Sequence, residues 1–372
     1  MIEPEPLEQI GRTYVRYRGR KLSYFSGCDY FRLARHSKVF AALAQGGKNC
    51  GVSIAASRMT TGNHPLYHEL EQKLAGFFGA PQALLVGSGY LSNLAVAQAL
   101  AGNFSHVLID EKAHASLQDA ARFLECPVVP FKHQSVTDVS NRVARCGPQA
   151  KIILLTDGLF AHDGSAAPLK RYLEELPSDG LILVDDAHAA GVLGNTGKGS
   201  LEHAAIGRQR VVQTITLSKA FGTYGGAILS SKPLRSLILK HSASFTGSTP
   251  LPLPLAKAAI SAIGILASDK RFLQRLRRNS ALVKDGLRMN GTRIPATPGP
   301  IIGLAPPDEQ ASRNLRRELL QARIFPPSIV YPSTGTSAYF RFAISSEHTV
   351  EQLEALQKTL LKAGLAGWGA MG

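Results

Sequence analysis

Short apolar runs that end in polar or glycine-bearing turns recur between about Ala83 and Ser231. Runs such as ALLV, HVLID, KIILLTD, LILVDDAH and VVQTITLSK are continuous in Val, Ile and Leu instead of alternating with polar residues. Continuous runs of this length indicate strands that are covered on both faces. Segments with a helical pattern, such as YLSNLAVAQALAG and HASLQDAARFLE, lie between them. This alternation predicts an α/β fold with a mostly parallel, doubly wound sheet, in which ligands bind at the carboxyl ends of the strands.

The pattern changes after Pro254. Long helical stretches lead into the strand-like segment IIGLAPP, a helix around residues 312–322, the strand YFRFAIS and a closing helix over residues 349–362. This order predicts a second, smaller α+β domain. We therefore expect an N-terminal arm over residues 1–40, a large domain over residues 41–254, and a small C-terminal domain over residues 255–372 that packs with the arm.

Composition favours a globular protein, because 44% of the residues are hydrophobic and 19% are charged. The long apolar stretch from Leu251 to Ser268 contains Pro252, Pro254 and Lys257, so a buried helix is expected there and no membrane span. The N-terminus carries charges where a signal peptide needs an apolar run. The four cysteines are scattered without a metal-like or disulfide-like spacing. We therefore expect free thiols, a cytoplasmic location and no metal site.

The net charge of +15 is high, and basic residues gather in the last third of the chain, in RFLQRLRRNS and at Arg316 and Arg317. A surface that steers an anionic substrate or an acidic carrier protein is one interpretation. Nucleic-acid binding and a merely solvated basic face are two others. The sequence contains no helix-turn-helix extension and no interleaving of aromatic and basic residues, so no nucleic-acid partner is expected.

Two carboxylates and a histidine end the strand LILVDDAH. Because successive strand residues face opposite ways, Asp185 and Asp186 cannot both contact one ligand. A buried carboxylate needs a cationic partner to offset its loss of water, and a protonated pyridine nitrogen supplies one. The alternative is that Asp185 only caps the following turn.

Lys219, in TLSKAFGTYGG, follows a strand, with hydroxyl residues before it and glycines after it. An amine that forms an imine must lose its proton part of the time, and burial near a cation favours this. Neighbouring hydroxyls can hold a phosphate, and glycines let the backbone approach closely. A single lysine in a turn is usually only solvated, but the D-x-x-H strand upstream favours a cofactor lysine.

Two further segments join a strand to a helix. In LLVGSGYLSNLAV, the first amides of the helix, at Gly89 and Tyr90, are suited to bind a phosphate. The spacing does not fit the dinucleotide pattern G-x-G-x-x-G. In DEKAHASLQDAAR, His114 lies between strand and helix, where an imidazole can stack on a planar ring.

Together these segments resemble the α-oxoamine synthases, a branch of the fold-type I pyridoxal-phosphate (PLP) enzymes with the aspartate aminotransferase-like fold. The resemblance runs from SGCDY near Ser26 to SSEHT near His348. It includes GSGYLSN, DEKAHASL, DGLFAHDGSAAPL, VDDAHAAGVLGNTGKGS, TLSKAFGTYGG and FRFAISSEHT. The order and spacing of this set are far more specific than any one motif.

The resemblance implies that PLP is the cofactor and assigns roles in holding it. Lys219 would be the Schiff-base lysine and the base at the α-carbon, and Asp185 would pair with the pyridine nitrogen. His188 would hydrogen-bond the 3′-oxygen of the ring, and His114 would stack on the ring and contact the substrate. The phosphate would be held by Gly89, Tyr90 and Thr216.

The same resemblance implies that Ser248 reaches the phosphate of a neighbouring subunit's cofactor, so a homodimer with shared active sites is expected. Arg341 would bind the amino-acid carboxylate, a bidentate contact suited to guanidinium. Ser328 is a further substrate-binding candidate. Three residues depart from the family pattern: Ala161 replaces a serine, Cys28 replaces an asparagine and Tyr339 replaces an arginine.

The activity implied is decarboxylative condensation of a small amino acid, alanine or glycine, with an acyl thioester carried by coenzyme A or an acyl-carrier protein. The reaction of 8-amino-7-oxononanoate synthase is the first expectation. Glycine C-acetyltransferase or another acyl specificity is the alternative. More distant alternatives are a fold-type I aminotransferase and a non-catalytic partner subunit, although the presence of Lys219 argues against the latter.

Overall fold

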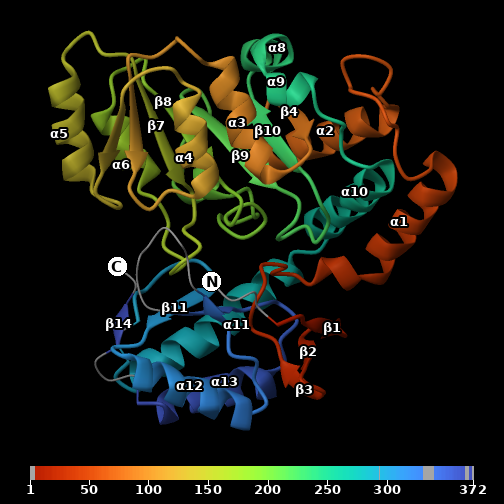
Figure 1. Ribbon diagram of the computed structural model, residues 1–372, viewed down its shortest axis with the longest axis vertical. Helices are drawn as coiled ribbons and strands as arrows, with labels where there is room; N and C mark the ends of the chain where they lie inside the picture. Colours follow the sequence, from red (N-terminus) through yellow and green to blue (C-terminus); the bar gives the residue numbers. More distant parts are fainter. Residues whose placement is uncertain (1–4, 293, 330–338, 365–367, 371–372) are drawn as a thin grey trace. The chain divides into compact units, whose positions relative to one another are not determined.

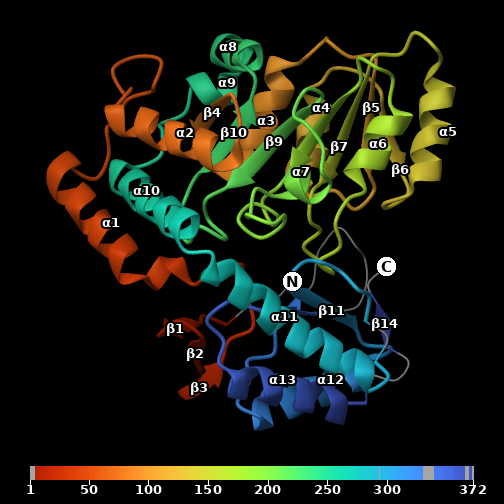
Figure 2. The same cartoon turned by 180° about the vertical axis from the view of Figure 1, so that it is seen from behind.

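The computed structural model describes residues 5–292, 294–329, 339–364 and 368–370 (Figures 1 and 2). The chain forms two compact units. The large unit comprises His36–Phe160 and Ala166–Asp269, and the small unit comprises Met1–Arg35, Ala161–Ser165 and Lys270–Gly372. A five-residue segment from the middle of the sequence therefore belongs to the small unit.

A seven-stranded sheet in the order β4-β10-β9-β8-β7-β5-β6 forms the centre of the large unit. Its strands are β4 (Gln82–Val86), β5 (His106–Asp110), β6 (Val128–Phe131), β7 (Ile152–Asp157), β8 (Leu181–Asp185), β9 (Val211–Thr216) and β10 (Gly226–Ser230). Strands β5 to β9 pair in parallel, whereas β10 runs antiparallel to both β4 and β9. The predicted α/β fold with a mostly parallel sheet is confirmed.

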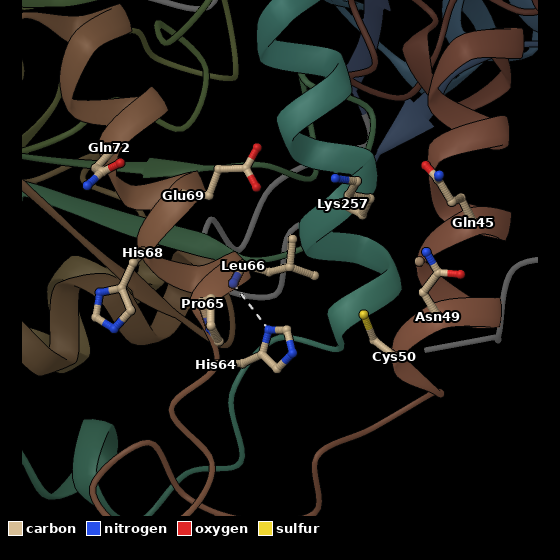
Figure 3. A pocket seen from close by; sticks show the side chains of 11 residues that line it. Gln45, Asn49, Cys50, His64, Pro65, Leu66, His68, Glu69, Gln72 and Lys257 are labelled. Carbon is tan, nitrogen blue, oxygen red and sulfur yellow. Dashed lines mark hydrogen bonds between the residues drawn. The ribbon is translucent and has the colours of Figure 1, made fainter.

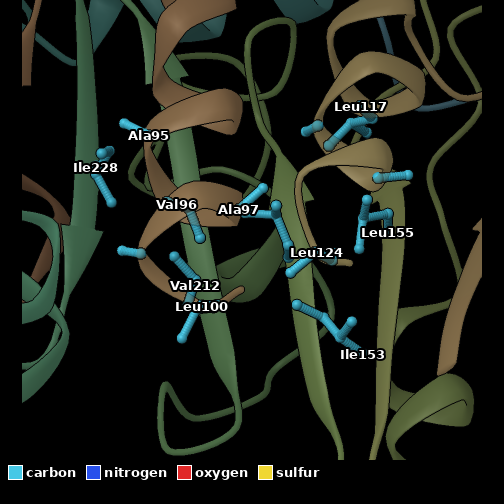
Figure 4. Packing of buried hydrophobic residues seen from close by; sticks show 14 of the residues in the cluster. Ala95, Val96, Ala97, Leu100, Leu117, Leu124, Ile153, Leu155, Val212 and Ile228 are labelled. Atoms are coloured by element: carbon cyan, nitrogen blue, oxygen red, sulfur yellow. The ribbon is translucent and has the colours of Figure 1, made fainter. Parts of the chain in front are cut away.

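Helices cover both faces of this sheet. The helices of the large unit are α1 (Ser37–Cys50), α2 (Pro65–Phe78), α3 (Gly89–Ala99), α4 (Ala115–Arg122), α5 (Val136–Cys146), α6 (Leu169–Glu175), α7 (Ser200–His203), α8 (Lys232–His241), α9 (Ala243–Thr246) and α10 (Leu253–Ser268). On β7, Ile153 and Leu155 pack with residues of α3 and α4 (Figure 4), while Ile152 and Leu154 pack with residues of α5 and α6. Burial on both faces explains the continuous apolar runs.

The small unit has a four-stranded antiparallel sheet in the order β12-β13-β11-β14, and α11, α12 and α13 share one apolar core with it. A separate three-stranded sheet, β1-β2-β3, is formed by the N-terminal arm. The elements are β1 (Glu8–Ile10), β2 (Tyr14–Tyr17), β3 (Arg20–Ser23), a 3₁₀ turn (Leu33–Arg35), α11 (Arg271–Met289), β11 (Ile301–Ala305), α12 (Glu309–Gln321), β12 (Ser328–Ile329), β13 (Tyr339–Ala343), α13 (Val350–Lys362) and β14 (Gly369–Ala370). The arm is fixed where the Ser23 amide donates to the Arg323 carbonyl at 2.8 Å.

The boundaries between the two units follow residues 35 and 269, whereas the sequence suggested boundaries after residues 40 and 254. Helix α10 packs against both α1 and α2, and α2 packs against β4, so α1 and α10 belong to the large unit. Asp269 and Lys270 separate α10 from α11, in the middle of what reads in the sequence as one helical stretch. No helix of the described residues is long and apolar enough to cross a membrane.

Candidate active site

Asp185 ends strand β8, and 5% of its surface is exposed. Its Oδ2 accepts hydrogen bonds from Asn93 Nδ2 at 2.6 Å and from Ser116 Oγ at 3.4 Å, and its Oδ1 accepts from the Ala187 amide at 2.9 Å. Thr214 donates to Asn93 Oδ1 at 2.6 Å and so fixes the asparagine. All these donors are neutral, and Asp185 forms no ion pair with a cation of the described residues.

Asp186 belongs to a different set of contacts. Its Oδ2 accepts from the Ser200 amide at 2.8 Å and from the side chain of Gln213. Burial raises the pKa of Asp186 to about 6, although these hydrogen bonds oppose the shift. The prediction that the two carboxylates address different partners is confirmed, and Asp186 has a structural role.

His114 and Asp157 lie beside Asp185. The His114 amide donates to Asp157 Oδ2 at 2.8 Å, and the imidazole Nδ1 lies 2.8 Å from Ser116 Oγ. Burial lowers the pKa of His114, an effect that Asp185 opposes and Lys219 reinforces. Burial, followed by repulsion from Asp185, raises the pKa of Asp157 well above its usual range.

Lys219 lies in the turn between β9 and β10 and is partly buried. Its charge acts on both His114 and Asp157, and the charge of Asp185 acts on the same two residues. The structure therefore brings Lys219, Asp185, His114 and Asp157 into one cluster. His188 is buried three residues beyond Asp185, in the turn that follows β8.

The N-terminus of α3 packs against the end of β9. Ser88 caps the helix by accepting from the Leu91 amide at 3.3 Å, and Gly89 is the first helical residue. A Cβ on Gly89 would lie 2.7 Å from Thr216 Cβ, so only glycine permits this contact. Tyr90 is partly exposed, donates its hydroxyl proton to Asp119, and meets His114 edge-on at 6.1 Å between ring centroids.

Ser248 also lies in the large unit, just after α9, and donates to the Ser244 carbonyl. Within the described residues no hydrogen bond joins Ser248 to Asp185 or Lys219. A cavity of about 590 Å³ between α1, α2 and α10 is lined by His64, Glu69 and Lys257, among others (Figure 3), and by none of the predicted site residues.

The small unit holds the remaining candidates. The Arg341 amide on β13 donates to the Pro327 carbonyl at 3.0 Å, and Ser328 pairs with Phe340 across β12 and β13. Burial and then Cys28 raise the pKa of Tyr30 well above its usual range, and Arg341 opposes this shift. Arg341 and Cys28 therefore both lie near the buried Tyr30 hydroxyl.

Within the described residues, no group of three or more His, Cys, Asp or Glu side chains is arranged to hold a metal ion. The four cysteines are free thiols.

Residues 29–360 match the aminotransferase class I and II family. The chain is 35% identical over 346 residues to an 8-amino-7-oxononanoate synthase of Thioalkalivibrio sulfidiphilus, covering 92% of this chain and 88% of the relative. It is 34% identical over 349 residues to the enzyme of the same name from Stutzerimonas stutzeri, with the same coverage. A solved serine palmitoyltransferase from S. paucimobilis, with a bound PLP–myriocin aldimine, superimposes with a TM-score of 0.89 at 26% identity, over 96% of this chain and 91% of that one.

The chain belongs to the α-oxoamine synthase branch of the aminotransferase class I and II family. An 8-amino-7-oxononanoate synthase of Francisella tularensis, at 22% identity and a TM-score of 0.77 over 91% of this chain and 97% of that one, shares the fold. The expected fold, enzyme class and cofactor are confirmed.

The cofactor of an α-oxoamine synthase fits the cluster in the large unit. Asp185 is a buried carboxylate with neutral donors and no cationic partner among the described residues, which suits a protonated pyridine nitrogen. The capped start of α3 beside Thr216 suits a phosphate, because helix N-terminal amides and a hydroxyl converge there.

The sequence analysis did not identify three residues of the candidate site, namely Asn93, Ser116 and Asp157. Asn93 and Ser116 hold Asp185, and Asp157 holds the backbone of His114. All three lie in quoted motifs, GSGYLSN, DEKAHASL and DGLFAHDG. One signal in the sequence could have found them: each is a polar residue beside an apolar run, and such a residue needs a hydrogen-bond partner once it is buried.

Proposed function

We propose that this α-oxoamine synthase condenses a small amino acid, alanine or glycine, with an acyl thioester and releases carbon dioxide and the thiol. The closest reaction is that of 8-amino-7-oxononanoate synthase. The observation that carries the proposal is the 35% identity over 92% of the chain to a relative of that name, in a chain that keeps Lys219 and Asp185 in one cluster.

Lys219 would hold the cofactor and move the proton at the amino-acid α-carbon. PLP supplies, when bound, a protonated ring that withdraws electrons from that carbon. Asp185, oriented by Asn93 and Ser116, would pair with the ring nitrogen and keep it protonated. His188 would donate to the ring oxygen, and Gly89, Tyr90 and Thr216 would hold the phosphate.

His114 would lie against the ring and polarise the thioester carbonyl. The lowered pKa of His114 favours its neutral imidazole. Because Nδ1 accepts from the Ser116 amide at 3.2 Å, the ring proton lies on Nε2, which can donate to a carbonyl oxygen. Asp157 fixes the His114 backbone, which supports a defined imidazole position.

Arg341 would bind the substrate carboxylate, with Ser328 as a further contact in the same unit. Cys28 lies with Arg341 near Tyr30, which supports a role for this group in amino-acid selection, because a thiol stands where the family pattern has an asparagine. Residues 330–338, which follow Ser328, lie outside the described residues.

The acyl group would arrive on coenzyme A or on an acyl-carrier protein, and both are anionic. The small unit has a groove of about 340 Å³ lined by Arg20, Arg313, Arg316 and Arg317, hereafter the arginine groove. Neither Arg316 nor Arg317 forms an ion pair with another described residue. Such a surface supports attraction of an anionic partner.

We also propose a homodimer with shared active sites, with Ser248 directed to the partner's cofactor phosphate. The exposed large apolar side chains of the large unit include Phe40 on α1, and Val52 and Met59 in the segment before α2. A second copy that covered them would remove this apolar surface from water. The free thiols suit the cytoplasm.

The test is incubation of the PLP-loaded enzyme with alanine or glycine and a panel of acyl thioesters, on both coenzyme A and a carrier protein. We expect equal amounts of thiol and carbon dioxide, and loss of both in Lys219→Ala. The acyl chain that gives the highest kcat/KM distinguishes a long acyl specificity from a glycine C-acetyltransferase-like one. Amino-group transfer to a keto acid without either product would instead show an aminotransferase.

A further inference from the structure

Residues 158–167 form a hairpin that belongs to both units. Its neck lies in the large unit, where Leu159 and Ala166 form an antiparallel bridge and the Ala167 amide donates to the Gly158 carbonyl at 3.2 Å. Its tip, Ala161–Ser165, belongs to the small unit. The hairpin therefore connects the two units in the middle of the chain.

The neck is fixed to the strand that carries Asp185. The Gly158 amide donates to the Asp185 carbonyl at 2.8 Å, and a Cβ on Gly158 would lie 1.8 Å from Asp186 Oδ1. Gly158 directly follows Asp157, which holds the His114 backbone. A displacement of the neck would therefore move Asp157 relative to His114.

The tip is fixed within the small unit by backbone contacts. The Gly299 amide donates to the Gly164 carbonyl at 3.0 Å, and Thr297 Oγ1 donates to the Asp163 carbonyl at 3.1 Å. A Cβ on Gly303 would lie 2.2 Å from the His162 carbonyl oxygen, so strand β11 touches the tip directly. Residues 297–299 and β11 therefore hold the tip in place.

Lys284, on α11, binds the segment of residues 297–299. It is 3% exposed, and its Nζ donates to the Thr297 carbonyl at 3.1 Å, to Thr297 Oγ1 at 2.8 Å and to the Gly299 carbonyl at 2.5 Å. All three protons of the ammonium group are used, and it forms no ion pair with a described residue. A buried ammonium group whose N–H donors all bind one short segment fixes the position of that segment.

We propose that Lys284 is a positioning residue for the active site, which holds Thr297 and Gly299 and so fixes the hairpin tip and, through the neck, the contact of Asp157 with His114. The effect on catalysis rests on the proposed function. The effect on the hairpin does not.

The charge of Lys284 gives the contact a pH dependence. Burial lowers the pKa of Lys284 to about 8, with Asp163 and Asp285 opposing the shift and Arg288 reinforcing it. Above that pH the neutral amine has two protons for three acceptors, so one hydrogen bond from Lys284 to residues 297–299 is lost as the pH rises.

Hydrogen exchange of the cofactor-free enzyme tests the hairpin directly. We expect amides of residues 158–167 to exchange about tenfold faster at pH 7 in Lys284→Met than in the wild type, because methionine keeps the volume and removes the three donors. Lys358→Met, at an exposed lysine on α13 of the same unit, is the matched control and should exchange like the wild type. Gly303→Ala, which pushes on the His162 carbonyl without altering Lys284, should also accelerate exchange of this segment.

Kinetics of the loaded enzyme test the positioning role. In Lys284→Met we expect kcat to fall about tenfold, with KM for the amino acid within about twofold. The wild-type kcat should decline with a midpoint near pH 8, and that step should be absent from the variant.

Unchanged exchange of residues 158–167 in both Lys284→Met and Gly303→Ala would overturn the proposal. So would faster exchange accompanied by a wild-type kcat and a wild-type pH profile. If the wild type converts no thioester, the proposed function fails, while hydrogen exchange still decides whether Lys284 fixes the hairpin.

Discussion

At the scale of single residues, two adjacent carboxylates have different hydrogen-bond partners. Asp185 meets three neutral donors at the carboxyl end of the sheet, whereas Asp186 is held by Ser200 and Gln213. Strand alternation predicted this separation from the sequence. It could not predict Asn93 or Ser116, because their contacts with Asp185 exist only once α3, α4 and β8 have come together.

We predict that Asp185→Asn lowers kcat by roughly 10²–10³-fold, the usual result of removing one preorganised electrostatic contact from an active site. A neutral amide cannot stabilise a protonated ring nitrogen. The measurement is kcat with saturating PLP and both substrates, together with the absorbance spectrum of the bound cofactor.

Asp186→Asn is the matched control for that prediction. Its amide oxygen can still accept from Ser200 and Gln213, but the carboxylate charge that strengthens these hydrogen bonds is lost, so we expect a loss of about 1–3 kcal/mol in the free energy of unfolding. Its kcat per folded, PLP-loaded molecule should remain within about threefold of the wild type. Equal losses of kcat in the two variants would contradict the separate roles of the carboxylates.

At the scale of elements, the candidate site depends on how closely α3 approaches the sheet. The continuous apolar runs predicted the strands, and the glycine turn GSGY predicted that a helix starts beside them. The sequence could not show that Gly89 lies against Thr216 or that Gly226 lies against the Ser88 carbonyl, where a Cβ would be 2.3 Å away. Those contacts depend on the antiparallel insertion of β10 between β4 and β9.

We predict that Gly89→Ala weakens PLP binding by about tenfold or more. The new Cβ would lie 2.7 Å from Thr216 Cβ, so α3 must move away from β9 and its first amides leave the phosphate position. The dissociation constant for PLP, followed by cofactor fluorescence, checks this. Gly76→Ala in α2, where a Cβ meets nothing within 4 Å, should bind PLP normally and be slightly more stable. Normal PLP binding by Gly89→Ala would refute the phosphate position.

At the scale of the whole molecule, the sequence predicted a large α/β part and a small α+β part but misplaced the changes between them. Helix α10 reads as the start of the small part because its apolar pattern continues into α11. Its packing with α1 and α2 assigns it to the large unit. The five residues at the hairpin tip were also unpredictable, because their membership follows from long-range contacts with residues 297–303.

Charge is a property of the whole molecule, and the sequence showed its sum and its concentration in the last third of the chain, but not which basic side chains share one surface. The net charge is +15, and the arginine groove gathers part of it on the small unit. Arg20 is tied to the Leu320 carbonyl at 3.0 Å, and Arg313 pairs with Glu309 at 2.7 Å. Arg316 and Arg317 have no such hydrogen bond or ion pair with a described residue, and the charge of Arg316 acts only at longer range on Glu5. They are therefore the two arginines of the groove most available to a partner.

We predict that Arg316→Glu combined with Arg317→Glu raises KM for an acyl-carrier-protein thioester by about tenfold at low ionic strength, because attraction becomes repulsion over a broad acidic surface. Added salt should shrink the difference from the wild type, since the effect acts between solvent-exposed charges. KM for the matching acyl-CoA should change less than threefold, because its charge is confined to a few phosphates. Arg171→Glu on α6, an exposed arginine of the large unit, is the control for charge reversal alone. An equal rise in KM for both thioesters would instead indicate that coenzyme A itself uses the groove, and no rise for either would leave these arginines as a solvated face.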